Sequence, residues 1–86
     1  MTVALPRHVL ATETESGLVL LDERGGRYWQ LNGSGATALR LLLAGTSARD
    51  AAEELTRGTT VGPEQAAADI AALLNALGQA GLVVVS

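Results

Sequence analysis

Residues able to do covalent or metal chemistry are scarce in this chain. It contains no cysteine and a single histidine, His8, at the start of a predicted strand. A metal site usually needs about four side-chain ligands, and His8 has no second histidine or thiolate to help complete one. We therefore interpret His8 as a partly exposed strand residue and predict no metal site and no cofactor.

The acidic pairs and the glycine-rich segment do not indicate an active site either. Glu13 and Glu15 flank a predicted turn, and Glu53-Glu54 falls on the solvated face of a predicted helix. The segment Gly33-Ser34-Gly35 follows a strand and opens a helix, as a phosphate-binding loop does. It lacks the third glycine of a dinucleotide motif and the lysine of a nucleotide loop. We predict that the chain is not an enzyme.

The segment Arg27–Leu31 is the strongest candidate for a binding site. It holds the only tyrosine and the only tryptophan of a chain that has no phenylalanine. Its position between a Gly-Gly turn and a helix cap predicts a strand that closes a small sheet. Because adjacent strand residues point to opposite faces, we predict Trp29 and Leu31 on the core side and Tyr28 and Gln30 facing out. An outward aromatic side chain beside an unpaired strand edge suits a docking surface.

The first third of the chain must provide the sheet around this strand. Residues 1–7 lack a pattern and are expected to form a leading arm, and the sheet is expected over residues 8–31. Near-alternation of apolar and polar residues predicts a strand at 8–14. The apolar run Leu18–Leu21 predicts a second strand, shielded on both faces. With the aromatic strand they predict an antiparallel meander whose third strand lies at an edge.

Three helices are predicted over residues 32–81. Asn32 or Ser34 can cap the first helix, and Gly45 ends it. Ser47 caps the second helix, and Pro63 suits the first turn of the third because its missing N–H would have had no partner. The tail, residues 82–86, is too β-branched to extend the helix and either packs extended against the core or stays exposed.

The third predicted helix has two distinct faces. Leucines and isoleucine at helical spacing form its core stripe. The neighbouring face carries Asp69, Ala72 and Ala76, and such small side chains let a peptide backbone approach closely. The alternative is that these alanines serve only helix propensity.

Composition and charge limit the classes of partner. Eighty-six residues make one domain, residues 1–86. Six arginines and no lysine face nine acids, for a net charge of −3, and only Glu64 and Asp69 are charged after Arg57. This distribution disfavours nucleic acid. No apolar run is long enough to span a membrane and nothing resembles a signal peptide, so we expect no membrane association and a cytoplasmic protein.

Several segments in this order resemble a known family. Two strands precede Gly26–Asn32 (GRYWQLN), and a leucine-rich helix leads to Ser47–Ala52 (SARDAA) and Pro63–Ile70 (PEQAAADI). Together they resemble a PqqD-like peptide recognition element, and in particular the small stand-alone proteins of lasso-peptide clusters. The resemblance covers roughly residues 5 to 82 of the chain.

The resemblance implies an α+β fold, a winged helix-turn-helix whose three-stranded antiparallel sheet packs on three helices. It also implies that the protein binds the leader segment of a ribosomally made precursor peptide, which adds as a strand to the third strand beside the third helix. A separate leader peptidase and a lasso cyclase would then act on the precursor. The residues implied for peptide binding are Arg27, Tyr28, Trp29, Gln30, Leu31, Asp69, Ala72, Leu73 and Ala76.

Two other functions remain open at this point. The same architecture usually reads DNA with its third helix, but that helix has no lysine or arginine here. Alternatively, the chain is a small structural subunit whose Tyr28 edge and apolar tail at 82–85 are buried against one obligate partner.

Overall fold

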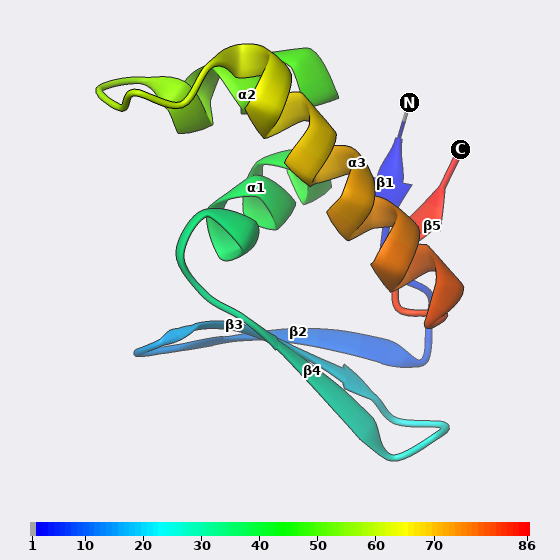
Figure 1. The fold of residues 1–86 in the computed structure, drawn as a ribbon. Helices are drawn as coiled ribbons and strands as arrows, with labels where there is room; N and C mark the ends of the chain where they lie inside the picture. The colour runs from blue at the N-terminus through cyan, green and yellow to red at the C-terminus, as the bar shows by residue number, and fades with distance from the viewer. Residues whose placement is uncertain (1) are drawn as a thin grey trace.

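The protein is built from a small sheet with three helices on one side of it (Figure 1). The computed structural model describes residues 2–86. The sheet is antiparallel with strand order β2-β3-β4, as the sequence predicts. Its strands and the helices are β2 (Val9–Thr14), β3 (Gly17–Asp22), β4 (Arg27–Leu31), α1 (Gly33–Leu43), α2 (Ala48–Thr56) and α3 (Pro63–Gln79). The predicted winged helix-turn-helix is confirmed.

Short local signals set the ends of the helices. The Ser47 hydroxyl accepts the N–H of Asp50 at 3.1 Å and caps α2, as predicted. Asn32 occupies the N-cap of α1, but its side chain makes no cap hydrogen bond, which differs from the expectation. Gly81, at a φ of +74°, terminates α3, and the N–H of Leu82 then donates to the carbonyl of Leu77 at 2.9 Å.

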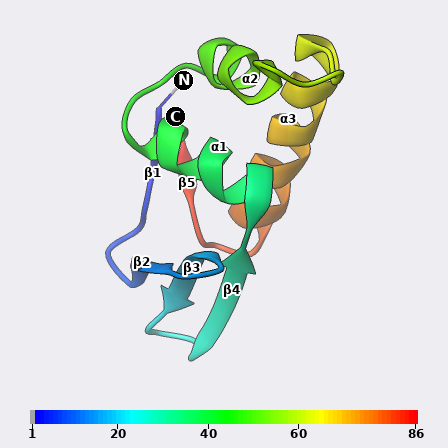
Figure 2. The same ribbon diagram turned by 90° about the vertical axis from the view of Figure 1, so that its left-hand side faces the viewer.

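The two ends of the chain form a second, two-stranded sheet. β1 (Val3–Ala4) pairs antiparallel with β5 (Val84–Val85). Thr2 and Ser86 extend the pairing with reciprocal backbone hydrogen bonds of 2.7 and 2.9 Å. The segment expected as a leading arm therefore contains a short paired strand that the sequence did not predict, and Met1 lies outside the described part. Of the two conformations expected for the tail, the structure shows the extended one, and β1 and β5 lie side by side (Figure 2).

The sheet is covered on one face only. Leu18 and Leu20 are buried toward the helices, but Leu21 is 39% exposed. The prediction that this strand is shielded on both faces is wrong, because all three helices lie on the same side of the sheet (Figure 1). On the uncovered face Leu10, Leu21 and Tyr28 are neighbours in register across the three strands, and all are exposed.

The start of β3 lies against the end of β4 with no room for a side chain. A Cβ atom on Gly17 would stand 2.1 Å from the carbonyl oxygen of Leu31 and 2.9 Å from the Cα atom of Asn32. Both obstacles are backbone atoms, which cannot rotate away. Gly17 also has a φ of +147°, which side chains disfavour. Glycine at this position thus lets the sheet lead directly into α1.

We predict that Gly17→Ala lowers the free energy of unfolding by about 1–3 kcal/mol, since the backbone must shift to admit the methyl group. Gly78→Ala is the matched control, because a Cβ there meets nothing within 4 Å and the residue lies inside α3. This control should be neutral or raise stability by up to about 1 kcal/mol. Urea unfolding of both variants measures the difference, and equal effects would contradict the close contact.

Candidate peptide-binding site

The aromatic strand has the predicted orientation. Trp29 is the cross-strand partner of buried Leu20 and therefore shares the face that the helices cover. It is nevertheless 40% exposed, because the helices do not fully cover this edge of the sheet. Leu31 is buried, and Tyr28 on the opposite face is 71% exposed.

The hydrogen bonds of the β3–β4 hairpin show which main-chain groups remain free. The carbonyl of Asp22 accepts the N–H of Gly26 at 2.8 Å, so the peptide groups of Asp22 face β4. In an antiparallel ladder every second residue bonds the same neighbouring strand. The β4 residues bonded to β3 are therefore Arg27, Trp29 and Leu31. The N–H and C=O groups of Tyr28 and Gln30 point to the open edge, where no described strand pairs with them.

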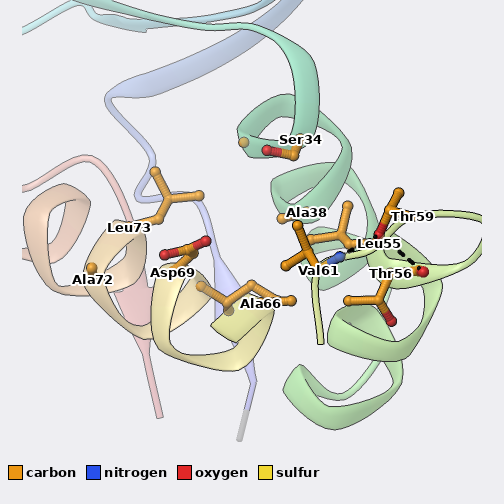
Figure 3. Close-up of a pocket in the computed structure, with 12 residues that line it drawn as sticks. Ser34, Ala38, Leu55, Thr56, Thr59, Val61, Ala66, Asp69, Ala72 and Leu73 are labelled. Atoms are coloured by element: carbon orange, nitrogen blue, oxygen red, sulfur yellow. Dashed lines mark hydrogen bonds between the residues drawn. The ribbon is translucent and has the colours of Figure 1, made fainter. Parts of the chain in front are cut away.

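A large hollow of about 550 Å³ lies just beyond the C-terminal end of β4. It is formed by the first turns of α1, the end of α2 with the loop that follows, and one face of α3 (Figure 3). Most of its lining is apolar. The lining residues are Ser34, Gly35, Ala38, Leu55, Thr56, Thr59, Val61, Ala66, Asp69, Ile70, Ala72 and Leu73.

Hydrogen bonds hold the wall of this hollow opposite α3. The Thr59 hydroxyl donates to the carbonyl of Thr56 at 3.1 Å, and the N–H of Val61 donates back to that hydroxyl at 3.3 Å (Figure 3). They place the exposed side chain of Val61 beside Leu55, across the hollow from α3. Sequence reasoning missed this wall. An apolar residue in an otherwise polar Gly-Thr loop was the one available signal.

A smaller hollow of about 140 Å³ lies at the other end of β4, lined by Arg27, Tyr28, Trp29, Ala80 and Leu82. Arg27 connects the hairpin to α3 here. Its Nη2 atom donates to the carbonyl of Ala80 at 3.4 Å and lies 3.7 Å from a carboxylate oxygen of Asp22. β4 residues thus line the smaller hollow, whereas the larger hollow lies beyond the strand, where α1 begins.

The residues proposed from the sequence fall around these hollows. Asp69, Ala72 and Leu73 line the larger one, and Arg27, Tyr28 and Trp29 line the smaller one. Gln30 and Leu31 lie between them on β4. Ala76 is exposed on α3, one turn after Ala72, and lines neither hollow.

The described residues offer no alternative centre of metal chemistry. Within 2–86, no group of three acidic or histidine side chains is placed to hold a metal ion. His8 is partly buried, with its Nε2 atom 4.0 Å from Asp22. None of the helices in that range is both long enough and apolar enough to cross a membrane.

Comparison with known proteins identifies the fold family. The family model described as coenzyme PQQ synthesis protein D (PqqD) matches residues 17–83. The chain belongs to the PqqD family. No curated protein sequence gives a significant match.

Two solved structures resemble this PqqD-family chain over almost its whole length. The first is "Lasso peptide synthetase B1 complexed with the leader peptide", with 38% identity, a TM-score of 0.92, and coverage of 99% of this chain and 100% of the other. The second is "TbiB1 in Complex with the TbiA(beta) Leader Peptide", with 22% identity, a TM-score of 0.83, and coverage of 96% and 94%. The second likeness shows the shared PqqD-like fold.

The β3–β4 hairpin of this PqqD-family domain is organised by the carboxylate of Asp22. It accepts the backbone N–H groups of Arg24 and Gly25, each at 3.0 Å. The bond from Gly25 lowers the pKa of Asp22 most; burial opposes it, while the bond from Arg24 and the charges of His8 and Arg27 lower the pKa further. The ionised form thus stabilises the turn that precedes β4.

We predict that Asp22 contributes to the acid sensitivity of the fold. Because its pKa is depressed in the folded state, its contribution is fully present above the unfolded pKa of about 4 and is lost as pH falls through the lower folded value. Asp22→Asn should therefore be less stable than the parent at neutral pH and should lose less stability on acidification. Urea unfolding from about pH 7 to about pH 3 measures this, with Asp50→Asn as control. Parallel curves for parent and Asp22→Asn would contradict the role.

Proposed function

We propose that this protein binds the leader segment of a ribosomally synthesised lasso precursor peptide and presents it to processing enzymes. The leader adds as a fourth strand to the open edge of β4 and lies beside α3. The protein itself supplies binding and orientation without catalysis. In this role it is a cytoplasmic partner of a leader peptidase and a lasso cyclase.

One observation carries the proposal. The edge of β4 is unpaired, one hollow is lined by its residues and a larger one lies beyond its end. The relative at 38% identity, which covers 99% of this chain, is complexed with a leader peptide. An extended peptide needs alternate free donors and acceptors along a strand, and Tyr28 and Gln30 present them here. Side chains of the added strand can then enter the two hollows and provide selection.

The chemistry of the site supports a binding role rather than catalysis. The larger hollow contains one ionisable side chain, Asp69, with hydroxyl groups only from Ser34, Thr56 and Thr59. The chain has no cysteine, and His8 lies on the hairpin side beside Asp22. Asp69 accepts a hydrogen bond from Gln65, and none of the three hydroxyl groups is hydrogen-bonded to it as a nucleophile would be to its base. Cleavage and ring closure would fall to separate enzymes.

DNA binding is the disfavoured alternative. A winged helix-turn-helix reads DNA with a helix that brings lysine and arginine to the phosphates. α3 spans Pro63–Gln79 and carries only Glu64 and Asp69 as charged residues. An acidic helix of this kind would repel the duplex.

Leader binding should be blocked by bulk and charge on the face of α3 that lines the larger hollow. We predict that Ala72→Glu weakens binding at least about tenfold, because the glutamate fills the hollow and must be desolvated. Titration of the leader peptide of the 38%-identical relative, followed by the fluorescence of Trp29, measures the affinity. Trp29 is the only tryptophan and is partly exposed beside the smaller hollow.

Ala67→Glu is the matched control, since Ala67 is also exposed on α3 but lines neither hollow. It should bind the leader as tightly as the parent, and circular dichroism should show both variants folded. If folded Ala72→Glu also binds like the parent, the leader does not use this hollow.

The purified protein should leave a precursor peptide intact. It should raise the rate of an added leader peptidase by lowering the apparent KM, since it contributes binding but no chemical group. Mass spectrometry of the precursor after incubation tests both statements. Leader cleavage by the protein alone would exclude a purely binding role.

A further inference from the structure

The larger hollow contains one charged side chain, and that charge is not neutralised within the described chain. Asp69 lies on α3 between Ala66 and Leu73, with its carboxylate at the opening toward α1 (Figure 3). Gln65 donates an N–H to one carboxylate oxygen at 3.0 Å, a neutral contact that leaves the charge in place. No arginine, histidine or lysine of residues 2–86 forms an ion pair with Asp69.

The nearby cations are engaged elsewhere or absent. Arg57, at the end of α2, is paired with Glu54 at 3.1 Å, and Arg27 at the far end of β4 is held by Asp22 and Ala80. No arginine follows Arg57 in the sequence. The hollow therefore combines an apolar lining with an uncompensated negative charge, in a protein whose net charge is −3.

We propose that Asp69 is a specificity-determining residue that selects a lysine or arginine in the bound leader. This rests on the proposed leader-binding function. An apolar side chain of the leader fills the hollow against Leu55, Val61 and Ile70, and a basic side chain from the same face of the added strand reaches Asp69. A leader with glutamate or aspartate at that position is rejected by repulsion between like charges.

The geometry of the strand sets where the basic residue lies in the leader. β4 spans five residues, so its two ends are about 13 Å apart at the usual rise per residue. The hollow with Asp69 lies beyond one end, and the hollow beside Trp29 lies at the other. The basic residue is thus expected at least about four leader residues away from the residue over the smaller hollow.

The probe for the test is the fluorescein-labelled leader peptide of the 38%-identical relative, with each residue replaced in turn by lysine and by glutamate. Affinities are measured for the parent, Asp69→Asn, Asp69→Lys and the control Glu64→Gln. Glu64 is the other acidic residue of α3 and does not line the hollow. Circular dichroism checks that each variant is folded.

We expect one leader position at which the parent binds the lysine peptide about threefold to tenfold more tightly than the glutamate peptide. This preference should disappear in Asp69→Asn, reverse in Asp69→Lys, and persist in Glu64→Gln. Raising the salt concentration from about 0.05 M to about 0.5 M should reduce it, because the pair is near the surface.

Two outcomes would overturn the proposal, and they differ in what else they overturn. In the first outcome, the peptides bind, but the lysine preference is the same in the parent and in Asp69→Asn at every position. Asp69 then does not select the charge of the leader, while the proposed leader binding is retained. If no peptide of the series binds the folded parent, both the charge selection and the proposed function are wrong.

Discussion

The open edge of β4 is the constraint on which the rest of the structure depends. Small sheets usually protect their edges with charges, prolines or bulges, because free main-chain groups invite pairing with another chain. The opposite edge strand, β2, carries the charged residue Glu13, whose carboxylate lies 2.7 Å from Nε of Arg40 on α1. β4 instead exposes the main-chain groups of Tyr28 and Gln30, with the smaller hollow lined by its residues and the larger hollow beyond its end.

The contacts that fix this edge are few, and two of them, Gly17 with Leu31 and Arg27 with Ala80, join distant parts of the chain. Gly17 allows the backbone of Leu31 to lie against the start of β3, which leads the sheet directly into α1. Asp22 organises the hairpin before β4 and holds Arg27, which in turn reaches the end of α3 at Ala80. The hairpin is thereby joined to the C-terminal end of α3.

In this arrangement the backbone of β4 and the side chains around it contribute differently to peptide binding. Main-chain bonds along an added strand depend little on the sequence of the peptide, so they provide affinity without much selection. In the proposed complex, selection depends on the two hollows, one mostly apolar with the single charge of Asp69, the other formed around Trp29 and Arg27. A site of this kind suits the binding of an extended peptide.

The sequence by itself determined the elements that depend on neighbouring residues. Caps such as Ser47, the helix-ending glycines, the three-strand meander and the side of the sheet on which Trp29 lies all follow from local periodicity and turn chemistry. Only the tertiary structure decided that β1 pairs with β5, that the apolar run of β3 is covered on one face, and that the loop at Val61 forms one wall of the larger hollow. Strands of two residues are too short to show an alternation of apolar and polar residues. A continuous apolar run has the same sequence pattern whether one face of the sheet or both faces are covered. Burial depends on where distant elements lie, which no local pattern records.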